Sequence, residues 1–504
     1  MGRNSDVVRD YRHLLKPLLY NILRSAAAIN RFPAFCGVLV GGSTLLQFPL
    51  RSLLTTFLTA LYRTHWRRRW QVDHVAVGRL SRFLATLFAA IASFALLNSR
   101  QHGRSEGELA HAQAAPRVQD SAIPPDVGTE PLAEPDTITS SQTLKSPLLF
   151  QAQDTASLSL PPSALAGKTL DLTLLTTVHA LSVLLTTTYP PPSRRTRLTA
   201  FISTSTFPLL FTFSSATIMH AYFYAPTRLP RAYVAWISRF ARLDSRLLHA
   251  LREARFGNWR YGREDGLAGL LGDMAEDYGM PRVWGDPAKT VPVPCELVHQ
   301  GMGKGCELNA GVRFVRAWLD AVKMYLPLRL GVALLRWLLR LRRQRRYGGG
   351  MGPGARPAAS ALPHLLTTAL ADAARSSAFL AAFVSLFYYG VCLARTRLGP
   401  RIFSSKTVTP QMWDSGLCIH AGCLLCGLSF LVLPGDGNRR ADIVFFVLPR
   451  ALGAWFPRRY ERRLMWREGA VFAVGAATVI TAAMERPERV GGVLGRVLRG
   501  VLAE

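Results

Sequence analysis

The chain contains one short pattern twice, and this duplication constrains its fold more than any other feature of the sequence. Asp442 is followed by seven mostly apolar residues, by Arg450 and by an Ala-Leu pair. The same pattern stands much earlier in the chain, with Asp171 as the acid and His179 in place of the arginine. Ionisable groups within apolar runs of membrane length are costly and usually face protein or water. Two such segments therefore predict a duplicated membrane protein in which two helices have the same role.

The duplication extends into the segments on both sides of this pattern. Residues 82–97 align with 418–433, and both segments contain a Ser-Phe pair, ending at Phe94 and at Phe430. Residues 216–228 align with 477–489 without a gap. The segments that begin near Phe35 and Phe379 align more weakly. A repeat of this length fixes the number of structural units. We therefore expect two repeats of four helices each.

Composition and charge favour a membrane protein over a disordered or nucleic-acid-binding chain. Of 504 residues, 49% are hydrophobic, and the net charge of +29 comes from 54 Arg and 7 Lys against 32 acids. The basic residues gather at the ends of apolar segments, at residues 67–69, 194–195, 342–343 and 458–459. Such flanking clusters fit anionic lipid headgroups better than a nucleic-acid surface. We therefore expect the lipid bilayer as a partner and no nucleic acid.

Apolar segments of the length that crosses a bilayer recur along the chain. A membrane helix needs about 20 apolar residues, because the hydrocarbon core is about 30 Å thick. Candidates lie near residues 33–58, 80–97, 169–188, 198–222, 374–395, 415–434, 441–456 and 469–484. The predicted fold class is all-α: a polytopic integral membrane protein with two four-helix repeats, joined by a central cysteine-containing segment with an amphipathic helix.

Composition divides the chain into consecutive parts. They are a basic N-terminal segment (1–31), the first four-helix repeat (32–224), a central cysteine-containing domain with the amphipathic helix (225–346), a Gly/Pro/Ala-rich linker (347–373), the second four-helix repeat (374–490) and a C-terminal tail (491–504). Within the first repeat, residues 99–166 offer little apolar surface to offset the entropy of ordering. We interpret them as a disordered loop and expect that its deletion leaves membrane insertion intact.

The central helix determines how the two repeats are oriented. Residues 312–341 interleave arginines with leucines and tryptophans. This pattern is typical of a helix that lies in the membrane interface. The charges recur every three or four residues and Pro327 interrupts the segment, so it is shorter than a full span. We therefore expect this helix not to cross and the two repeats to run parallel. A crossing would instead invert the second repeat.

Two glycines in the first apolar segment are candidates for helix packing. Gly37 and Gly41 lie four residues apart. Small residues at this spacing let two helices approach closely in lipid. We interpret the pair as a packing site, with a chance match as the alternative.

The polar residues of the duplicated pattern form the candidate intramembrane polar site: Asp171, His179, Asp442 and Arg450. An arginine exposed to lipid at mid-depth costs at least about 2.5 kcal/mol. We therefore expect His179 and Arg450 to occupy equivalent places and to face the helix bundle. For the two acids a simpler explanation is open, because each stands in the first turn of its helix, where the helix dipole favours a carboxylate.

The central segment carries possible metal ligands. Cys295, His299 and Cys306 follow a Cys-x3-His-x6-Cys pattern. Structural zinc sites typically have four ligands, and only three are visible here. We therefore favour a packed turn or a disulfide, expect no cofactor, and retain these residues as weak metal candidates.

A second group of thiols lies inside an apolar span, at Cys418, Cys423 and Cys426, with His420 among them. A buried thiol can behave as a small hydrophobe, so we favour helix packing over metal binding there. The chain also lacks the phosphate-binding loop, the zinc-protease motif, the nucleophile elbow and the dinucleotide fingerprint. We therefore do not expect an enzyme.

The central segment and the later apolar helices resemble the transmembrane protein 135 family, in a form similar to its fungal members. The resemblance rests on Pro294-Cys295-Glu-Leu-Val-His299 with Cys306, and on residues 323–328, 377–380, 421–429 and 439–452. That family is similar in turn to the Tim17, Tim22, Tim23 and Pmp24 group of small four-helix organelle proteins. The resemblance implies an integral protein of a peroxisomal or mitochondrial membrane, with a role in membrane dynamics or lipid handling. It brings no catalytic residues.

Two classes of function follow. The first is a structural or translocation-related organelle membrane protein, whose partners would be a second copy of the chain or other organelle membrane proteins. The second is a secondary transporter or translocation channel, since duplicated helix sets with ionisable residues near one interface often form a site at the bilayer midplane. Ion-driven uptake of a substrate into vesicles would distinguish the second class from the first.

Overall fold

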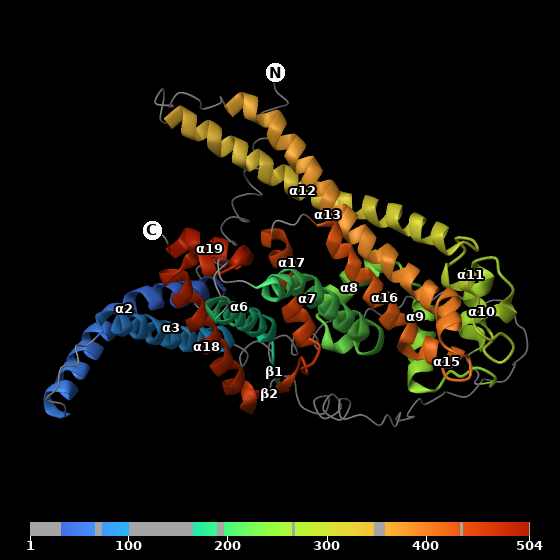
Figure 1. Cartoon of the computed structure of the whole chain (residues 1–504), viewed down its shortest axis with the longest axis horizontal. Helices are drawn as coiled ribbons and strands as arrows, with labels where there is room; N and C mark the ends of the chain where they lie inside the picture. The colour runs from blue at the N-terminus through green and yellow to red at the C-terminus, as the bar shows by residue number, and fades with distance from the viewer. Residues whose placement is uncertain are drawn as a thin grey trace, which may run out of the picture. The chain divides into compact units, whose positions relative to one another are not determined.

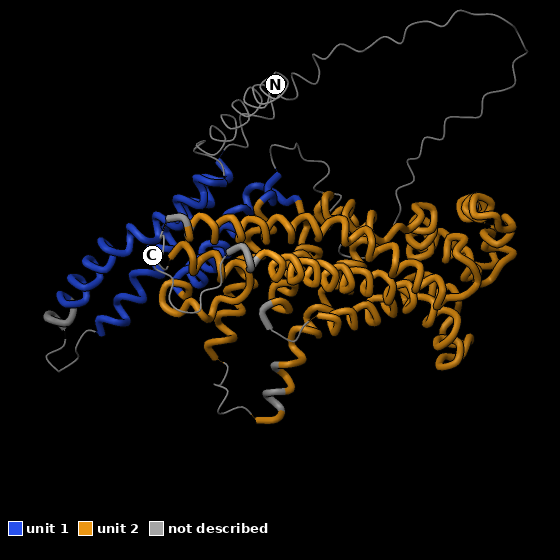
Figure 2. The backbone as a smooth tube through the Cα atoms, turned by 90° about the horizontal axis from the view of Figure 1, so that it is seen from above, with its two compact units in different colours: residues 1–168, 459–481 blue, residues 169–458, 482–504 orange. Residues whose placement is uncertain are grey.

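The structure is a computed structural model, and the residues it describes are almost entirely helical (Figure 1). These residues are 32–65, 73–99, 165–188, 196–264, 268–346, 358–433 and 437–502. The expectations for the N-terminal segment and for nearly all of the 99–166 loop concern residues outside these ranges. The chain forms two compact units (Figure 2), and each combines segments that are distant in the sequence. Unit 1 contains residues 1–168 and 459–481, and unit 2 contains residues 169–458 and 482–504.

The described residues of unit 1 form three long helices and one short pair of strands. Its elements are α2 (Phe32–His65), α3 (His74–Asn98), β1 (Leu165–Ala166), β2 (Tyr460–Glu461), η8 (Arg462–Leu464) and most of α18 (Met465–Glu485). The strands β1 and β2 pair antiparallel. The Asp73 carboxylate caps α3 by accepting a hydrogen bond of 2.9 Å from the backbone N–H of Val75. The ring of Phe472 on α18 lies 5.8 Å from that of Phe35 and 5.5 Å from that of Phe94, between ring centroids, so an aromatic cluster joins the three helices.

Unit 2 holds the remaining described elements. They are α6 (Leu170–Thr188), α7 (Arg197–Tyr224), η3 (Pro226–Arg228), α8 (Arg231–Ala241), α9 (Ser245–Phe256), α10 (Ala268–Asp277), η4 (Arg282–Gly285), α11 (Cys295–Val298), α12 (Cys306–Arg346), α13 (Ala358–Cys392), η5 (Leu393–Arg397), α14 (Gly399–Ile402), α15 (Pro410–Met412), η6 (Trp413–Leu417), α16 (Cys418–Cys426), η7 (Gly427–Val432), α17 (Gly437–Gly453), η9 (Pro487–Arg489) and α19 (Gly492–Leu502). Its main core contains Phe223, Ile419 and Phe430, whose side chains are almost fully buried.

The long helices α12 and α13 lie side by side and antiparallel. The indole N–H of Trp318 donates to the carbonyl of Ala374 at 3.3 Å, and the hydroxyl of Ser385 donates to the carbonyl of Ala310 at 2.8 Å. Helix α12 is one continuous helix of 41 residues that includes Pro327, longer at both ends than the expected amphipathic helix. Helix α13 begins at Ala358, within the segment expected to be a linker. The alanine- and leucine-rich residues from there onward are good helix formers.

Two π-helical turns meet where α13 ends. Turn η5 follows α13 directly and η6 precedes α16. They are joined by a buried ion pair, in which Nε of Arg395 lies 2.6 Å from Oδ1 of Asp414. The Tyr261 hydroxyl donates a 2.5 Å hydrogen bond to the same carboxylate and accepts one of 3.0 Å from the backbone N–H of Val293. This network fixes the end of α13 to the segment that precedes α11.

Six described helices are long and apolar enough to cross a membrane, so the chain is an integral membrane protein. They are Phe32–Ala60, His74–Asn98, Leu170–Thr188, Leu362–Ile402, Pro410–Val432 and Arg462–Glu485. Two further expected spans are also helical, in α7 and α17, but they do not satisfy the same criteria. Helix α17 has only 17 residues and carries four charged side chains, and α7 is rich in serine and threonine.

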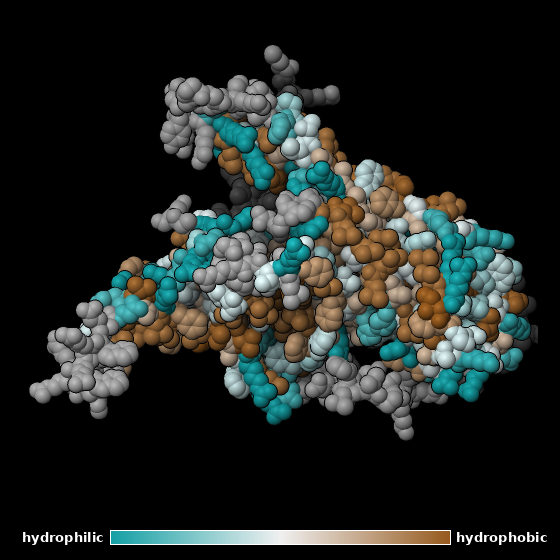
Figure 3. Space-filling model, viewed as in Figure 1, coloured by the Kyte–Doolittle hydropathy of each residue, from teal (hydrophilic) through white to brown (hydrophobic). Residues whose placement is uncertain are grey.

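The polarity of the surface differs between the long apolar helices and the region of α10 and α11. On the face shown in Figure 3, hydrophobic side chains gather over α2 and α3 and over the middle of α13, whereas hydrophilic ones surround α10 and α11. Large apolar side chains on α2 are strongly exposed, among them Leu45 at 72% and Phe48 at 69%. Lipid contact explains apolar exposure of this extent on helices of membrane length.

Candidate functional site

A cavity of about 420 Å³ lies in unit 2, between α7, α8, α12, α13 and α17. Its volume falls within the range of about 300–1,000 Å³ that is typical of small-molecule sites. Ten aromatic side chains line it: Phe211, Tyr233, Trp236, Phe240, Tyr325, Phe379, Phe383, Phe387, Tyr388 and Phe446. Such a lining favours an apolar ligand.

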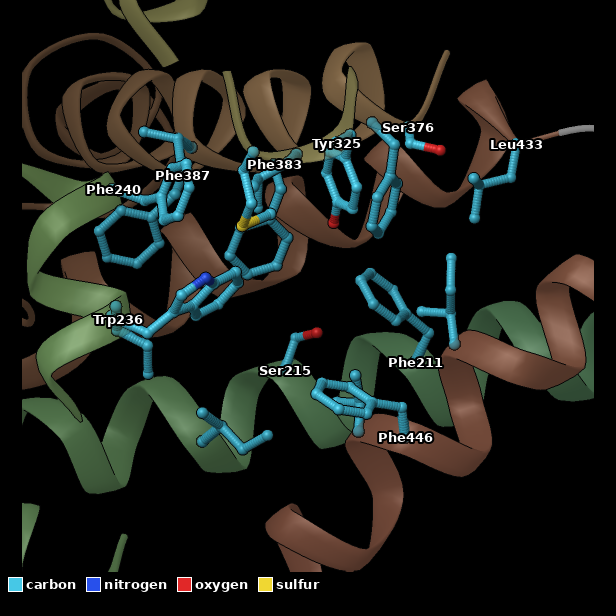
Figure 4. A pocket seen from close by; sticks show the side chains of 18 of the residues that line it. Phe211, Ser215, Trp236, Phe240, Tyr325, Ser376, Phe383, Phe387, Leu433 and Phe446 are labelled. Atoms are coloured by element: carbon cyan, nitrogen blue, oxygen red, sulfur yellow. The ribbon is translucent and has the colours of Figure 1, made fainter. Parts of the chain in front are cut away.

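The lining changes in character along α13. Phe387, Phe383 and Phe379 line the cavity at intervals of one helical turn, and Ser376 continues the same face toward the start of the helix. Figure 4 shows Phe387 and Phe240 at one end of the cavity and Ser376 and Leu433 at the other. The cavity therefore has an end lined mainly by aromatic rings and an end with polar and aliphatic side chains.

Three arginines line the cavity at its polar end. Arg375 precedes Ser376, and Arg329 lies one helical turn after Tyr325, which Figure 4 shows beside Ser376. Arg439 of α17 pairs with Asp372, its Nη2 lying 2.6 Å from Oδ1. Among the described residues, the guanidinium groups of Arg329 and Arg375 have no carboxylate within salt-bridge distance. Asp442, one turn after Arg439, also lines the cavity, but its carboxylate is paired with Arg496. The two guanidinium groups without a carboxylate partner suit a ligand with an apolar chain and an anionic group at one end.

The two copies of the duplicated pattern lie on α6 and α17, which pack against each other. The ring of His179 on α6 stacks on that of Phe445 on α17, with centroids 4.4 Å apart. At the other end of the contact, the Asp171 carboxylate accepts two hydrogen bonds of 2.9 Å from Arg458, which follows α17. The start of α6 therefore faces the end of α17, and the two helices run antiparallel.

This antiparallel packing corrects the parallel orientation expected from the sequence. That expectation treated the central helix as too charged and too short to cross. The structure shows α12 as one continuous helix of 41 residues. Since an α-helix rises about 1.5 Å per residue, α12 is longer than the hydrocarbon core of about 30 Å. Helix α12 is nevertheless not among the described helices that are apolar enough to cross a membrane, so its non-crossing stays a prediction.

The four polar residues of the pattern do not converge on one site. Asp442 pairs with Arg496 of α19 at 2.7 Å and lies near His179, because a Cβ placed on Gly492 would be 3.6 Å from Oδ1 of Asp442 and 3.4 Å from Cε1 of His179. His179 is buried, with 3% of its surface exposed. The acids are thus held by arginines at opposite ends of the α6–α17 contact.

Arg450 is half-buried and packs against aromatic rings. Its guanidinium carbon lies 3.8 Å from the centroid of Phe446 and 5.5 Å from that of Tyr233. This is the geometry of a cation–π contact. Both rings also line the cavity. Arg450 therefore supports the wall of the cavity rather than pairing with Asp442.

The glycine pair expected to pack helices does not do so among the described residues. A Cβ on Gly37 or on Gly41 would meet no atom within 4 Å. The close contact lies one residue further along, where a Cβ on Gly42 would be 2.9 Å from Cβ of Ala89 on α3. One residue turns a helix by about 100°, so the pattern identified the right helix and the wrong face.

The weak metal candidates lie together in the structure. Cys295 begins α11, His299 follows it and Cys306 begins α12, and all three lie beside Cys392, the last residue of α13. The four potential ligand atoms lie within 4.8 Å of one another. His299, Cys306 and Cys392 are buried and Cys295 is half-buried.

The cluster also has an unusual electrostatic character. Hydrogen bonding from the Cys392 thiol lowers the pKa of Cys295 to about 4, against the opposing effect of burial. This shift favours the thiolate form of Cys295. The thiolate is the form of cysteine that binds metals and acts as a nucleophile.

Sequence reasoning missed two features of these sites. Cys392 lies far beyond Cys306, at the end of an apolar helix, and nothing in its local pattern marks it as a ligand. The cavity draws on several helices, so no single stretch carries its signature. The thiols Cys418, Cys423 and Cys426 are buried along α16, apart from the Cys295 cluster.

The fold and the cavity define a class, that of helical polytopic membrane proteins with an internal apolar cavity. Comparison of the chain with known protein families, with curated proteins and with solved structures found no match.

Proposed function

We propose that this chain is a membrane protein of the transmembrane protein 135 type that binds a single-chain amphiphile with an anionic head group. A fatty acid has this chemistry. The observation that carries the proposal is the aromatic cavity of about 420 Å³ with Arg329 and Arg375 at one end. The resemblance of the sequence adds a peroxisomal or mitochondrial membrane as the expected location and lipid handling as the expected role.

The proposal includes a duplicated architecture in which the repeats exchange helices. Two equivalent aromatic clusters support it: Phe35 and Phe94 pack around Phe472 at 5.8 and 5.5 Å in unit 1, and Phe379 and Phe430 pack around Phe211 at 5.6 and 4.9 Å in unit 2. Each member of one cluster corresponds by sequence alignment to a member of the other. In both, the first two helices of one repeat enclose the last helix of the other repeat.

The turn after that last helix gives independent support. Helix α7 ends at Tyr224 and α18 at Glu485, and the 3₁₀ turns Pro226–Arg228 and Pro487–Arg489 follow at equal distance. The helices that follow the two turns are α8 and α19. Their first residues, and also their last residues, are separated by the same number of positions as the two turns are. The same backbone hydrogen bond of 2.8 Å closes each helix, from Ala225 to Ala221 and from Arg486 to Ala482.

Photochemical labelling of the whole protein in a non-ionic detergent tests ligand binding. A photoreactive fatty acid is expected to label the cavity face of α13, residues 376–388, and unlabelled fatty acid should compete. A fatty alcohol of the same length should compete about fivefold less, since a partly exposed ion pair contributes about 1 kcal/mol. Labelling spread over the exposed helix faces, without competition, would refute the cavity as the binding site.

Two variants make this experiment specific. Replacing Arg329 and Arg375 with glutamate should remove the preference for the acid over the alcohol. The control is Arg401→Glu, which changes an exposed arginine of α14 that does not line the cavity. An equal effect of the control would show that net charge, and not the cavity, determines binding.

The antiparallel packing of α6 and α17 favours a second candidate, a secondary transporter. Inverted repeats with ionisable residues at their interface occur in many transporters. Here the interface holds His179 and Asp442, each within reach of Gly492. Uptake of an anionic amphiphile into reconstituted vesicles, driven by an ion gradient, would favour the transporter, whereas binding without gradient-dependent uptake would favour a lipid-binding protein.

A further inference from the structure

The side-chain cluster around His299 lies in unit 2 beside α11, and none of its four residues lines the cavity. It joins four residues from three parts of the chain: Cys295 and His299 from the α11 turn, Cys306 from the start of α12, and Cys392 from the end of α13. The three cysteines are free thiols, so their sulfurs are available as ligands. Three sulfurs and one imidazole nitrogen within 4.8 Å of one another form a four-ligand set.

The distances match the dimensions of a tetrahedral zinc site. Zinc binds thiolate sulfur at about 2.3 Å and histidine nitrogen at about 2.0 Å, so the ligand atoms around it lie about 3.5–3.8 Å apart. The four atoms here have a maximum separation of 4.8 Å, and Nε2 of His299 already lies 3.3 Å from Sγ of Cys392. Small side-chain rotations therefore suffice to close the shell.

The histidine is oriented as a metal ligand. Its Nδ1 forms a 2.8 Å hydrogen bond with the carbonyl of Gly303. An N–H at Nδ1 fixes the tautomer in which Nε2 carries the lone pair, and ligating histidines usually have such a partner. The bond depends on a tight turn, in which Gln300, Gly301 and Gly303 all have positive φ.

The surrounding contacts hold the ligands from α12 and α13 in register. The residues next to Cys306 and near Cys392 are joined by the ion pair of Glu307 and Arg397, with Nη2 and Oε2 3.0 Å apart. Arg395 contributes a second guanidinium close to the cluster, and it is anchored by Asp414. The Arg395 charge favours the thiolate form of Cys295.

We propose that Cys295, His299, Cys306 and Cys392 bind one zinc ion in a closed structural site. Three thiolates and an imidazole select zinc over magnesium or calcium, which prefer oxygen ligands. Four protein ligands leave no open position for a substrate, so the ion connects helices rather than acting as a catalyst. The site links the α11 turn to the adjoining ends of α12 and α13. This inference does not depend on the proposed lipid binding.

The first test measures metal in the full-length protein purified in detergent under reducing conditions. We expect about one zinc ion per chain by elemental mass spectrometry. A strong chelator should remove it and make three further thiols reactive toward a thiol reagent. A chain without zinc whose thiols react equally with and without the chelator would overturn the proposal, as would a chain whose mass shows a disulfide among these cysteines.

Variants then identify the ligands. Cys392→Ser and His299→Ala should lose the zinc on passage over a competing chelator, whereas His299→Cys keeps four ligands and should retain it. Cys423→Ser is the matched control, since it removes a buried thiol outside the cluster. Cobalt substitution should give the absorption of a tetrahedral thiolate site in the wild type and in His299→Cys. Retention of zinc by Cys392→Ser, or its loss from Cys423→Ser as well, would contradict the assignment.

Discussion

Gly492 occupies a position that favours glycine. It begins α19 with a φ of +77°, and a Cβ there would lie 2.9 Å from Cδ2 of Phe445. A left-handed conformation costs a residue with a side chain about 1–3 kcal/mol, and the contact with Phe445 adds to that cost. The position also explains how Asp442 and His179 come close to each other, because both lie against the bare backbone.

We therefore expect Gly492→Ala to destabilise unit 2 by at least about 1 kcal/mol. Thermal unfolding in detergent, followed by the exposure of buried thiols, measures the change. The matched control is Gly500→Ala on the same helix, where a Cβ meets no atom within 4 Å. Alanine favours the helix there by about 0.5–1 kcal/mol. Equal behaviour of the two variants would mean that the Gly492 contact does not contribute to stability.

At the residue scale, the sequence predicted positions well only where the relevant partners lie close together in the chain. Cys295, His299 and Cys306 were recognisable from their spacing within one short stretch. Cys392 was not, because a turn and two long helices bring it back to the others. Gly42 was missed for another reason: the small-residue pattern identifies a spacing, and several registers of the same helix satisfy it.

At the scale of elements, the direction of α6 relative to α17 is the most informative contact. Helices that occupy equivalent places in two repeats run in the same direction when an even number of crossings separates them, and in opposite directions when the number is odd. The pairing of Asp171 with Arg458 at one end and of His179 with Phe445 at the other establishes opposite directions.

We expect epitope tags inserted after Lys168, before α6, and after Asp436, before α17, to be accessible from opposite sides of the membrane. Antibody binding to sealed vesicles, before and after permeabilisation, measures the sidedness of each tag. A tag after Thr196, beyond α6, serves as the control and should appear on the side opposite to the Lys168 tag. Access to the tags before α6 and α17 from the same side would show that α12 does not cross.

The helices themselves were largely predictable, but their limits were not. Apolar segments near residues 80–97 and 169–188 became α3 and α6 with similar bounds. Hydrophobic content of that length specifies a helix. Residues 358–373 of the expected linker form the first part of α13, although glycine and proline before Ala358 gave the whole segment a linker composition. The central helix was expected at residues 312–341, and it extends from Cys306 to Arg346 because the flanking residues continue the helix.

At the scale of the whole molecule, each of the two units combines segments that are far apart in the sequence. Unit 1 needs residues 459–481 to complete the core formed by α2 and α3. Phe472 is fully buried there, with 0% of its surface exposed. Composition alone could not predict that residues 459–481 pack in unit 1, because the aligned segments are equally compatible with two separate repeats.

We expect Phe472→Ala to destabilise unit 1 by about 3–5 kcal/mol, the usual cost of a large cavity in a core. Protease cleavage near Asp73, at the start of α3, should become faster, although the substitution lies in a distant part of the sequence. Val474→Ala is the control, since Val474 lies on the same helix and is 53% exposed. If cleavage near Asp73 is unchanged in Phe472→Ala, α18 does not stabilise the first two helices.

The place of residues 459–481 in unit 1 also has a consequence for biosynthesis. When α3 leaves the ribosome, most of the chain must still be made before Phe472 emerges. At about 5–20 residues per second, this takes on the order of tens of seconds. During that interval the sides of α2 and α3 that later contact α18 lack the described residues that cover them in the structure, and we expect lipid or an insertion factor to take their place. A nascent chain stalled before α18 is thus the form of this protein on which such a factor would be captured.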